Sequence, residues 1–146
     1  MIQKILLLLV FSTYSLMAYN TGDMLDKAVT EKLGLKKDKL YVIDFFASWC
    51  RSCKKEIPLI SKVHRDKVVE VIGINVDTDA SKGKAFVSKH KVPFRVVYDT
   101  NKVLISVFNP VGIPALYYVK NGKVLGMHIG AMKNIDKKII EEVKGL

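Results

Sequence analysis

Cysteine is scarce in this sequence: only Cys50 and Cys53 are present among 146 residues. A secreted domain that depends on disulfides for its stability normally carries several spaced pairs. A bridge between two cysteines this close in the chain would constrain little of the unfolded state, so it would stabilise the fold only weakly. We therefore interpret the pair, which encloses Arg51 and Ser52, as a reactive group rather than a structural one.

Metal ligands are scarce too. Two cysteines make at most half of a structural zinc site, and the histidines show no paired spacing that would complete it. These histidines are His64, His90 and His128. We therefore expect no metal and no other cofactor, and we interpret the histidines as surface or packing residues.

The N-terminus lacks a hydrophobic run long enough to cross a membrane as a helix. Residues 5–11 are apolar, and even when extended to Ala18 the segment is shorter than the roughly 20 residues required. A lysine before this run and the small Ala18 after it are typical of a signal peptide. Because Leu16 stands where a small residue is preferred, an uncleaved anchor is the alternative. We expect residues 1–18 to be a signal peptide or N-terminal membrane anchor, and 19–146 to form one domain in the periplasm or another extracytoplasmic compartment.

Acidic residues are outnumbered by basic ones. The 14 Asp and Glu residues face 24 Lys and Arg residues, which gives a formal net charge of +10. Such a balance favours anionic partners or membrane surfaces. The lysines are spread along the chain and form no basic stripe with interleaved aromatic residues, so we expect no nucleic-acid partner. We interpret them as a solvated surface.

Apolar runs and periodic patterns alternate along the rest of the chain. Strands are expected at residues 40–46, 68–76, 94–98, 115–119 and 124–129, and helices at 20–34, 54–64, 80–91, 103–108 and 135–143. Asn121-Gly122, between the last two strands, is a strong hairpin signal. In the third helix, Ala85, Phe86 and Val87 are expected to face inward. This order predicts an α/β domain with three layers and a mixed central sheet, with the cysteine pair where the first strand passes into a helix.

The segment around the cysteines resembles the active site of the thioredoxin superfamily. Residues 42–53 read Val-Ile-Asp-Phe-Phe-Ala-Ser-Trp-Cys-Arg-Ser-Cys, and Glu56, three residues after the second cysteine, is similar to the exported TlpA/ResA-like (CcmG-like) branch. Residues 92–99 and 112–118 also fit that branch. The resemblance implies a thioredoxin-like fold with an extra strand–helix insertion, supplied by residues 80–108, before the cis-proline loop.

The two cysteines have different expected roles. A helix that begins at Cys50 would direct unpaired N–H groups and the positive end of its dipole at the sulfur, which favours the thiolate. Cys50 is therefore the predicted nucleophile that attacks a substrate disulfide. Cys53 lies one helical turn further on, within reach of the same sulfur, and would resolve the mixed disulfide.

Two carboxyl groups near the pair are candidate catalytic residues. Asp44 lies within the apolar first strand, where burial should raise its pKa and suit it to exchange a proton with Cys53. Its alternative role is that of an aspartate hydrogen-bonded to the backbone. Glu56 is expected either to tune Cys53 from the same helix or to be a solvated partner of Lys54 or Lys55.

The resemblance also implies a substrate-binding edge. In the superfamily, the proline that corresponds to Pro114 is cis and lies against the cysteines, and it would present the backbone of Ile113 to an extended substrate chain. Trp49 is expected beside the cysteines, as a lid or packing residue that can touch substrate. The branch often opens with a β-hairpin, but residues 19–38 look too short and too helical to form one.

These features predict a periplasmic thiol–disulfide oxidoreductase that reduces protein disulfides. The branch resemblance implies a role in cytochrome c maturation, with apocytochrome c as substrate and a membrane protein as electron donor, and we expect a monomer. Arg51 favours the opposite, disulfide-donating direction of a DsbA-like oxidase by stabilising the thiolate, whereas Glu56 opposes it. A thioredoxin-fold binding or chaperone module is a further alternative.

Overall fold

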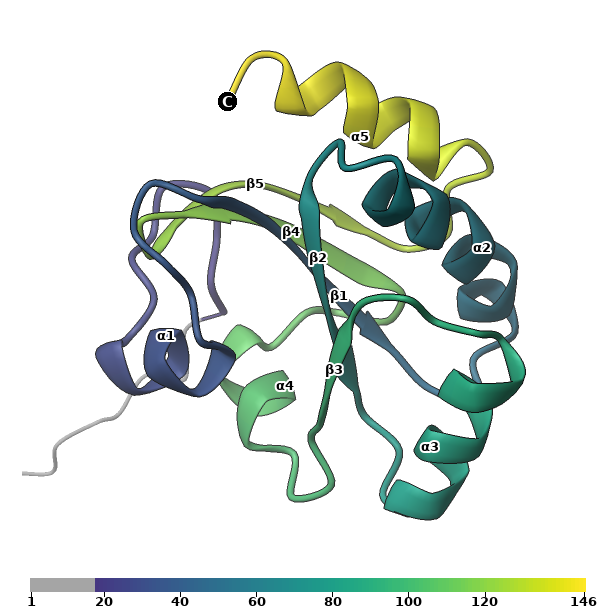
Figure 1. Ribbon diagram of the computed structural model, residues 1–146. Helices are drawn as coiled ribbons and strands as arrows, with labels where there is room; N and C mark the ends of the chain where they lie inside the picture. The colour runs from purple at the N-terminus through teal and green to yellow at the C-terminus, as the bar shows by residue number, and fades with distance from the viewer. Residues whose placement is uncertain (1–17) are drawn as a thin grey trace, which may run out of the picture.

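A five-stranded mixed sheet in the order β3-β2-β1-β4-β5 lies at the centre of the computed structural model, which describes residues 18–146 (Figure 1). The strands are β1 (Leu40–Phe46), β2 (Glu70–Asn75), β3 (Arg95–Tyr98), β4 (Ala115–Lys120) and β5 (Lys123–Ile129). The first three run parallel to one another, whereas β4 is antiparallel to β1 and β5 is antiparallel to β4. The predicted mixed sheet is confirmed.

Five helices cover the two faces of this sheet. They are α1 (Lys27–Leu33), α2 (Arg51–Arg65), α3 (Ala80–Lys89), α4 (Val103–Phe108) and α5 (Ile135–Val143). Helices α1 and α4 lie on one face, and α2, α3 and α5 lie on the other (Figure 1). The three-layer α/β architecture that the sequence predicts is therefore present.

The central strand shows why both faces must be covered. Side chains alternate between the faces of a strand, so Phe45 and Phe46 point in opposite directions. The ring of Phe45 packs on Phe108 of α4, with ring centres 5.0 Å apart, and the ring of Phe46 packs on Phe86 of α3 at 5.6 Å. A strand buried on both sides needs apolar residues at every position, which explains the continuous apolar run in the sequence.

Helix α1 is shorter than the sequence pattern predicts. It begins at Lys27 rather than near residue 20, because the chain before it pairs with the start of β5. The amide of Gly22 donates to the Val124 carbonyl at 2.8 Å, and the amide of Leu25 donates to the Gly122 carbonyl at 2.7 Å. Residues 18–38 contain no β-hairpin, in agreement with the sequence prediction.

The expected inward face of α3 is partly wrong. Phe86 is buried and Val87 is half-buried, but Ala85 is exposed. Gly83 is buried in place of Ala85 and packs against Asn75 of β2. A glycine has no apolar side chain, so hydrophobic periodicity does not register it as part of the buried face.

The inserted element between β2 and β4 consists of α3, β3 and α4, and it matches the predicted residues 80–108. Asp99 holds its last helix in place, because its buried carboxylate accepts from the amides of Leu104 and Ile105 at 3.0 and 2.8 Å. The chain then passes through the Ile113–Pro114 peptide bond, which is cis as predicted.

The N-terminal prediction concerns residues 1–18, of which all but Ala18 lie outside the described part of the chain. Within residues 18–146, none of the helices combines the length and the apolar character that a bilayer-spanning helix needs.

Candidate active site

The two cysteines form a disulfide at the point where β1 ends and α2 begins. Their Cα atoms are 5.3 Å apart, and Cys50 is the N-cap residue of α2. The Cys50 sulfur accepts a hydrogen bond from the backbone amide of Cys53 at 3.2 Å, so the helix N-terminus points at this sulfur as the sequence predicts. The amide would stabilise negative charge on the same atom once the disulfide is reduced.

The two sulfurs differ in accessibility. Cys50 is 6% exposed and Cys53 is 1% exposed, so Cys50 is the more accessible of the two to an incoming disulfide. Sequence analysis did not single out Ser52, whose hydroxyl lies 3.6 Å from the Cys50 sulfur. This geometry fits the predicted order in which Cys50 attacks and Cys53 resolves.

Asp44 is a fully buried carboxyl group in the middle of β1. It is 1% exposed, and its Oδ1 atom has no hydrogen-bond partner among residues 18–146. Loss of solvation raises the pKa of Asp44 well above the usual aspartate value, and the nearby charge of Glu56 raises it further. The alternative of an aspartate satisfied by backbone hydrogen bonds does not hold for Oδ1. A buried carboxyl group with a raised pKa suits proton exchange.

Glu56 lies one helical turn beyond Cys53 and is also buried. Its Oε1 atom accepts from the backbone amide of Met132, in the loop between β5 and α5. Burial raises the pKa of Glu56, although the Met132 amide and the nearby His128 act in the opposite direction. The carboxylate is therefore held inside the protein and is not a solvated partner of the neighbouring lysines.

A buried polar network fixes the loop that precedes Cys50, and sequence analysis missed it. Asp77 accepts from the amide and the hydroxyl of Ser48 at 2.9 and 2.6 Å, and from the side-chain amide of Asn75 at 2.7 Å. Burial alone raises the pKa of Asp77, but these hydrogen bonds outweigh it and hold the pKa below its usual value. Asp77 thus anchors the chain two residues before the reactive sulfur.

Trp49 and Ile113 line the same apolar cavity beside the disulfide. The indole is 67% exposed, and the cavity has a volume of about 460 Å³. Its other lining residues are Val76, Lys102, Ile105, Pro110 and Gly112. Pro114 itself is buried at the end of this loop, whereas the neighbouring Val111 is 98% exposed. The loop therefore offers an accessible apolar edge next to Cys50.

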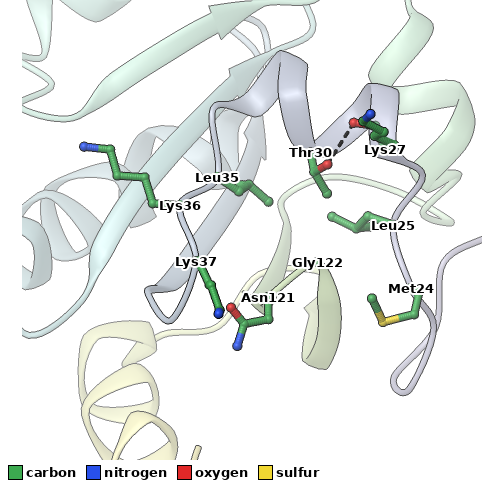
Figure 2. Close-up of a pocket in the computed structure, with 9 residues that line it drawn as sticks. All are labelled: Met24, Leu25, Lys27, Thr30, Leu35, Lys36, Lys37, Asn121 and Gly122. Carbon is green, nitrogen blue, oxygen red and sulfur yellow. Dashed lines mark hydrogen bonds between the residues drawn. The ribbon is translucent and has the colours of Figure 1, made fainter.

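A larger cavity, shown in Figure 2, lies at the other end of the sheet. Its volume is about 610 Å³, and Lys27, Lys36 and Lys37 lie along it together with the Asn121-Gly122 turn. This turn adjoins the start of β1, because Leu40 pairs with Lys120, so the cavity is remote from Cys50. It contains none of the predicted site residues. In the part of the chain that the structure describes, no group of three potential metal ligands occurs.

Residues 22–126 match the sequence profile described as the AhpC/TSA family, and this stretch is more than half of the chain. The chain belongs to the AhpC/TSA family. Like the superfamily resemblance in the sequence, this membership rests on the segment that contains both cysteines and the cis-proline loop.

Curated relatives of this AhpC/TSA member include proteins named thiol-disulfide oxidoreductase ResA. The one from Bacillus anthracis is 29% identical over 106 residues, which cover 68% of this chain and 61% of the relative. The one from Bacillus subtilis (strain 168) is 28% identical over 100 residues, covering 66% and 56%. The chain thus spans about three-fifths of the length of the relatives it matches.

Solved structures confirm the thioredoxin-like fold. A protein from Chlorobium tepidum described as a putative thiol:disulfide interchange protein DsbE superposes with a TM-score of 0.70 at 20% identity, covering 88% of this chain and 98% of that one. A secreted disulfide oxidoreductase of Mycobacterium tuberculosis, described as homologous to E. coli DsbE, gives 0.66 at 26% identity, covering 75% and 84%.

Proposed function

We propose that this protein is a thiol–disulfide oxidoreductase that reduces disulfides in other proteins outside the cytoplasm. The observation that carries the proposal is the Cys50–Cys53 disulfide at the N-terminus of α2, with the more accessible sulfur bonded to the Cys53 amide. The names of the ResA relatives and of the DsbE-like structures support the same chemistry.

The reaction begins from the reduced pair. The Cys50 thiolate attacks one sulfur of a substrate disulfide, a Cys50–substrate bond forms, and the other substrate sulfur leaves and takes up a proton. Cys53 then loses its proton and attacks the Cys50 sulfur, which releases the second substrate sulfur as a thiol. Two electrons pass to the substrate, and the protein is left as the Cys50–Cys53 disulfide.

The buried carboxyl groups take part in the proton transfer of the second step. Cys53 is almost completely buried, so bulk water cannot take its proton directly. Asp44 and Glu56 both have a raised pKa because of burial, and a carboxyl group whose pKa lies closer to neutrality exchanges protons more effectively. We assign Asp44 to the exchange with Cys53 and Glu56 to tuning the same thiol.

The cellular setting is part of the proposal. An extracytoplasmic location agrees with the export-like N-terminus and with the secreted disulfide oxidoreductase of Mycobacterium tuberculosis. A membrane electron donor and apocytochrome c as substrate are what the resemblance to the TlpA/ResA-like branch implies. We propose that the protein works there as a monomer without a cofactor, held to the membrane where residues 1–18 remain uncleaved.

The reduction potential tests the direction of electron flow. Purified protein is equilibrated with glutathione buffers, and the disulfide fraction is measured. A value near the thioredoxin potential of about −270 mV supports the reductase, whereas a value near about −120 mV overturns it in favour of the DsbA-like oxidase that Arg51 would promote.

Trapping identifies the substrate. Cys53→Ala cannot resolve the mixed disulfide, so it should retain substrate proteins on Cys50 that mass spectrometry can name. Cys50→Ser is the matched control and should trap nothing. If Cys50→Ser instead retains full cellular function, the protein is a binding or chaperone module.

A further inference from the structure

A second groove lies beside the disulfide, between α2 and α3. It has a volume of about 290 Å³, and Ser48, Ala85 and Phe86 are among the residues that line it. The others are all basic or ionisable: Lys54, Lys82, Lys89 and His90. Ser48 is two residues before Cys50, and the amide of Lys54 donates to the Cys50 carbonyl at 3.2 Å, so the groove begins at the active-site loop.

The lysines of this groove form no close ion pairs with carboxylates of the described chain. None of the ion pairs found in residues 18–146 includes Lys54, Lys82 or Lys89. Asp79 accepts from the amide and hydroxyl of Ser81 at 2.9 and 2.6 Å, and its negative charge also acts on Lys82, so the charge of that lysine is partly balanced. Lys54 and Lys89 form no ion pair in the described part of the chain, so the groove keeps an excess of positive charge beside the disulfide.

The spacing of the lysines suits an extended chain. Lys82 and Lys89 are two helical turns apart on α3, a separation of roughly 10 Å along the helix axis. About three residues of extended polypeptide cover this distance. Ala85 and Phe86 lie between the two lysines, so the groove has an apolar floor and basic edges.

We propose that this groove, which we call the basic groove, docks an acidic segment of the partner protein next to the disulfide that is reduced. The proposal rests on the proposed function and names a feature of its substrate: Asp or Glu residues close in sequence to the reactive cysteine. Charge complementarity of this kind raises the association rate of the two proteins and holds the partner in one orientation. The apolar cavity at Trp49, on the other side of the loop, then receives the chain beyond the cysteine.

Two peptides with an internal disulfide test the proposal. They are identical except that the three residues beside one cysteine are acidic in the first and neutral in the second, and each rate is normalised to reduction by dithiothreitol. The reduced wild-type protein should reduce the acidic peptide about tenfold faster at low salt, and the advantage should vanish at high salt.

Charge-reversal variants locate the effect. Lys82→Glu/Lys89→Glu should slow reduction of the acidic peptide about tenfold and leave the neutral peptide within twofold. The matched control is Lys36→Glu/Lys37→Glu, which changes the net charge equally at the remote cavity of Figure 2 and should leave both rates within twofold.

Three outcomes overturn the proposal. Equal slowing by both double variants would mean that only net charge matters, and a wild-type protein with no preference for the acidic peptide would have no docking site. In both cases the neutral peptide is still reduced, so the proposed function stands. If the protein reduces neither peptide, both the proposed function and the docking site are overturned.

Discussion

A buried carboxyl group makes the stability of this protein depend on pH. Asp44 has a pKa well above its ordinary value of 3.8 because the surroundings do not solvate its charge. Between that value and the raised pKa, the unfolded chain has released this proton while the folded chain retains it. The unfolded state then binds fewer protons, so the free energy of unfolding falls as pH rises through this window.

Asp44→Asn should remove this dependence. The amide is nearly the same size and carries no charge, so the variant should gain stability relative to wild type as pH rises above 4, by about 1.4 kcal/mol per pH unit up to the raised pKa. Urea unfolding between pH 4 and 9 measures the difference. Glu141→Gln, at an exposed carboxylate, is the control and should show no such trend. A stability gap that is constant with pH contradicts a raised pKa.

The anchor of the active-site loop behaves in the opposite way. The lowered pKa of Asp77 contributes stability that is present above pH 3.8 and is lost as pH falls through the folded-state pKa. Ser48→Ala removes the 2.6 Å hydrogen bond to this carboxylate and should cost about 1.5–3 kcal/mol at pH 7. The cost should shrink in acid, where Asp77 is protonated.

Urea unfolding of Ser48→Ala at pH 7 and at an acidic pH well below 3.8 provides the comparison. Ser106→Ala, at an exposed serine of α4, should change stability by less than about 0.5 kcal/mol at both pH values. If Ser48→Ala changes the stability as little as Ser106→Ala does, Ser48 does not stabilise the charged form of Asp77.

The residues of the site differ in how easily their roles can be recognised from the sequence. The cysteine pair is recognisable because its spacing is local, and Asp44 stands out because a charge interrupts an apolar strand. Ser48 and Asp77 are 29 residues apart, and each is an ordinary polar residue in its own segment. Their hydrogen bonds depend on β1 and β2 pairing side by side, so no local pattern could predict this anchor.

At the scale of the elements, one close contact joins α3 to β2. A Cβ atom placed on Gly83 would lie 2.2 Å from Oδ1 of Asn75, which is far inside contact distance. Asn75 cannot move away freely, because its side chain holds Asp77 at 2.7 Å. The absence of a side chain at Gly83 therefore sets how closely the helix approaches the sheet.

Gly83→Ala should destabilise the protein, against the usual trend. Replacing a helical glycine by alanine normally raises the free energy of unfolding by up to about 1 kcal/mol. Here the clash with Asn75 should reverse the sign and lower it by about 1–3 kcal/mol. Thermal and urea unfolding measure it. Ser88→Ala, on the exposed side of the same helix, should be neutral or slightly stabilising. A more stable Gly83→Ala protein would show that the contact relaxes without penalty.

Most elements could be predicted because each is specified by its own residues. Strand β1 is a run of apolar β-formers, and the turn before β5 is Asn121-Gly122, where both residues have positive φ. The sequence pattern places the start of α1 too early, because residues 22–25 pair with the start of β5, which lies far along the chain. Periodicity records only neighbours in sequence, so it extends the helix into this segment.

At the scale of the whole molecule, the redox state and the stability of the fold are linked. A protein that acts as a reductant has a disulfide form that is stabilised relative to its dithiol form, and the reverse holds for a strong oxidant. The proposed function therefore predicts which of the two forms resists unfolding better.

The disulfide form should be the more stable one, by at least about 1.4 kcal/mol for every 30 mV by which folding lowers the reduction potential of the pair. Urea unfolding with and without dithiothreitol measures this difference. Cys53→Ala cannot form the disulfide, so its unfolding midpoint should not respond to the reductant. A dithiol form that is more stable to urea than the disulfide form would support the oxidase instead.

The pairing of residues 22–25 with β5 also affects how the protein behaves at high concentration. β5 is at the edge of the sheet, and the free amides and carbonyls of an edge strand can recruit a second chain and start aggregation. Bonds to Gly22, Asp23 and Leu25 already occupy those groups at the beginning of β5. The segment before α1 thus covers the first residues of this edge strand against pairing with a second chain, at the end of the sheet opposite the disulfide.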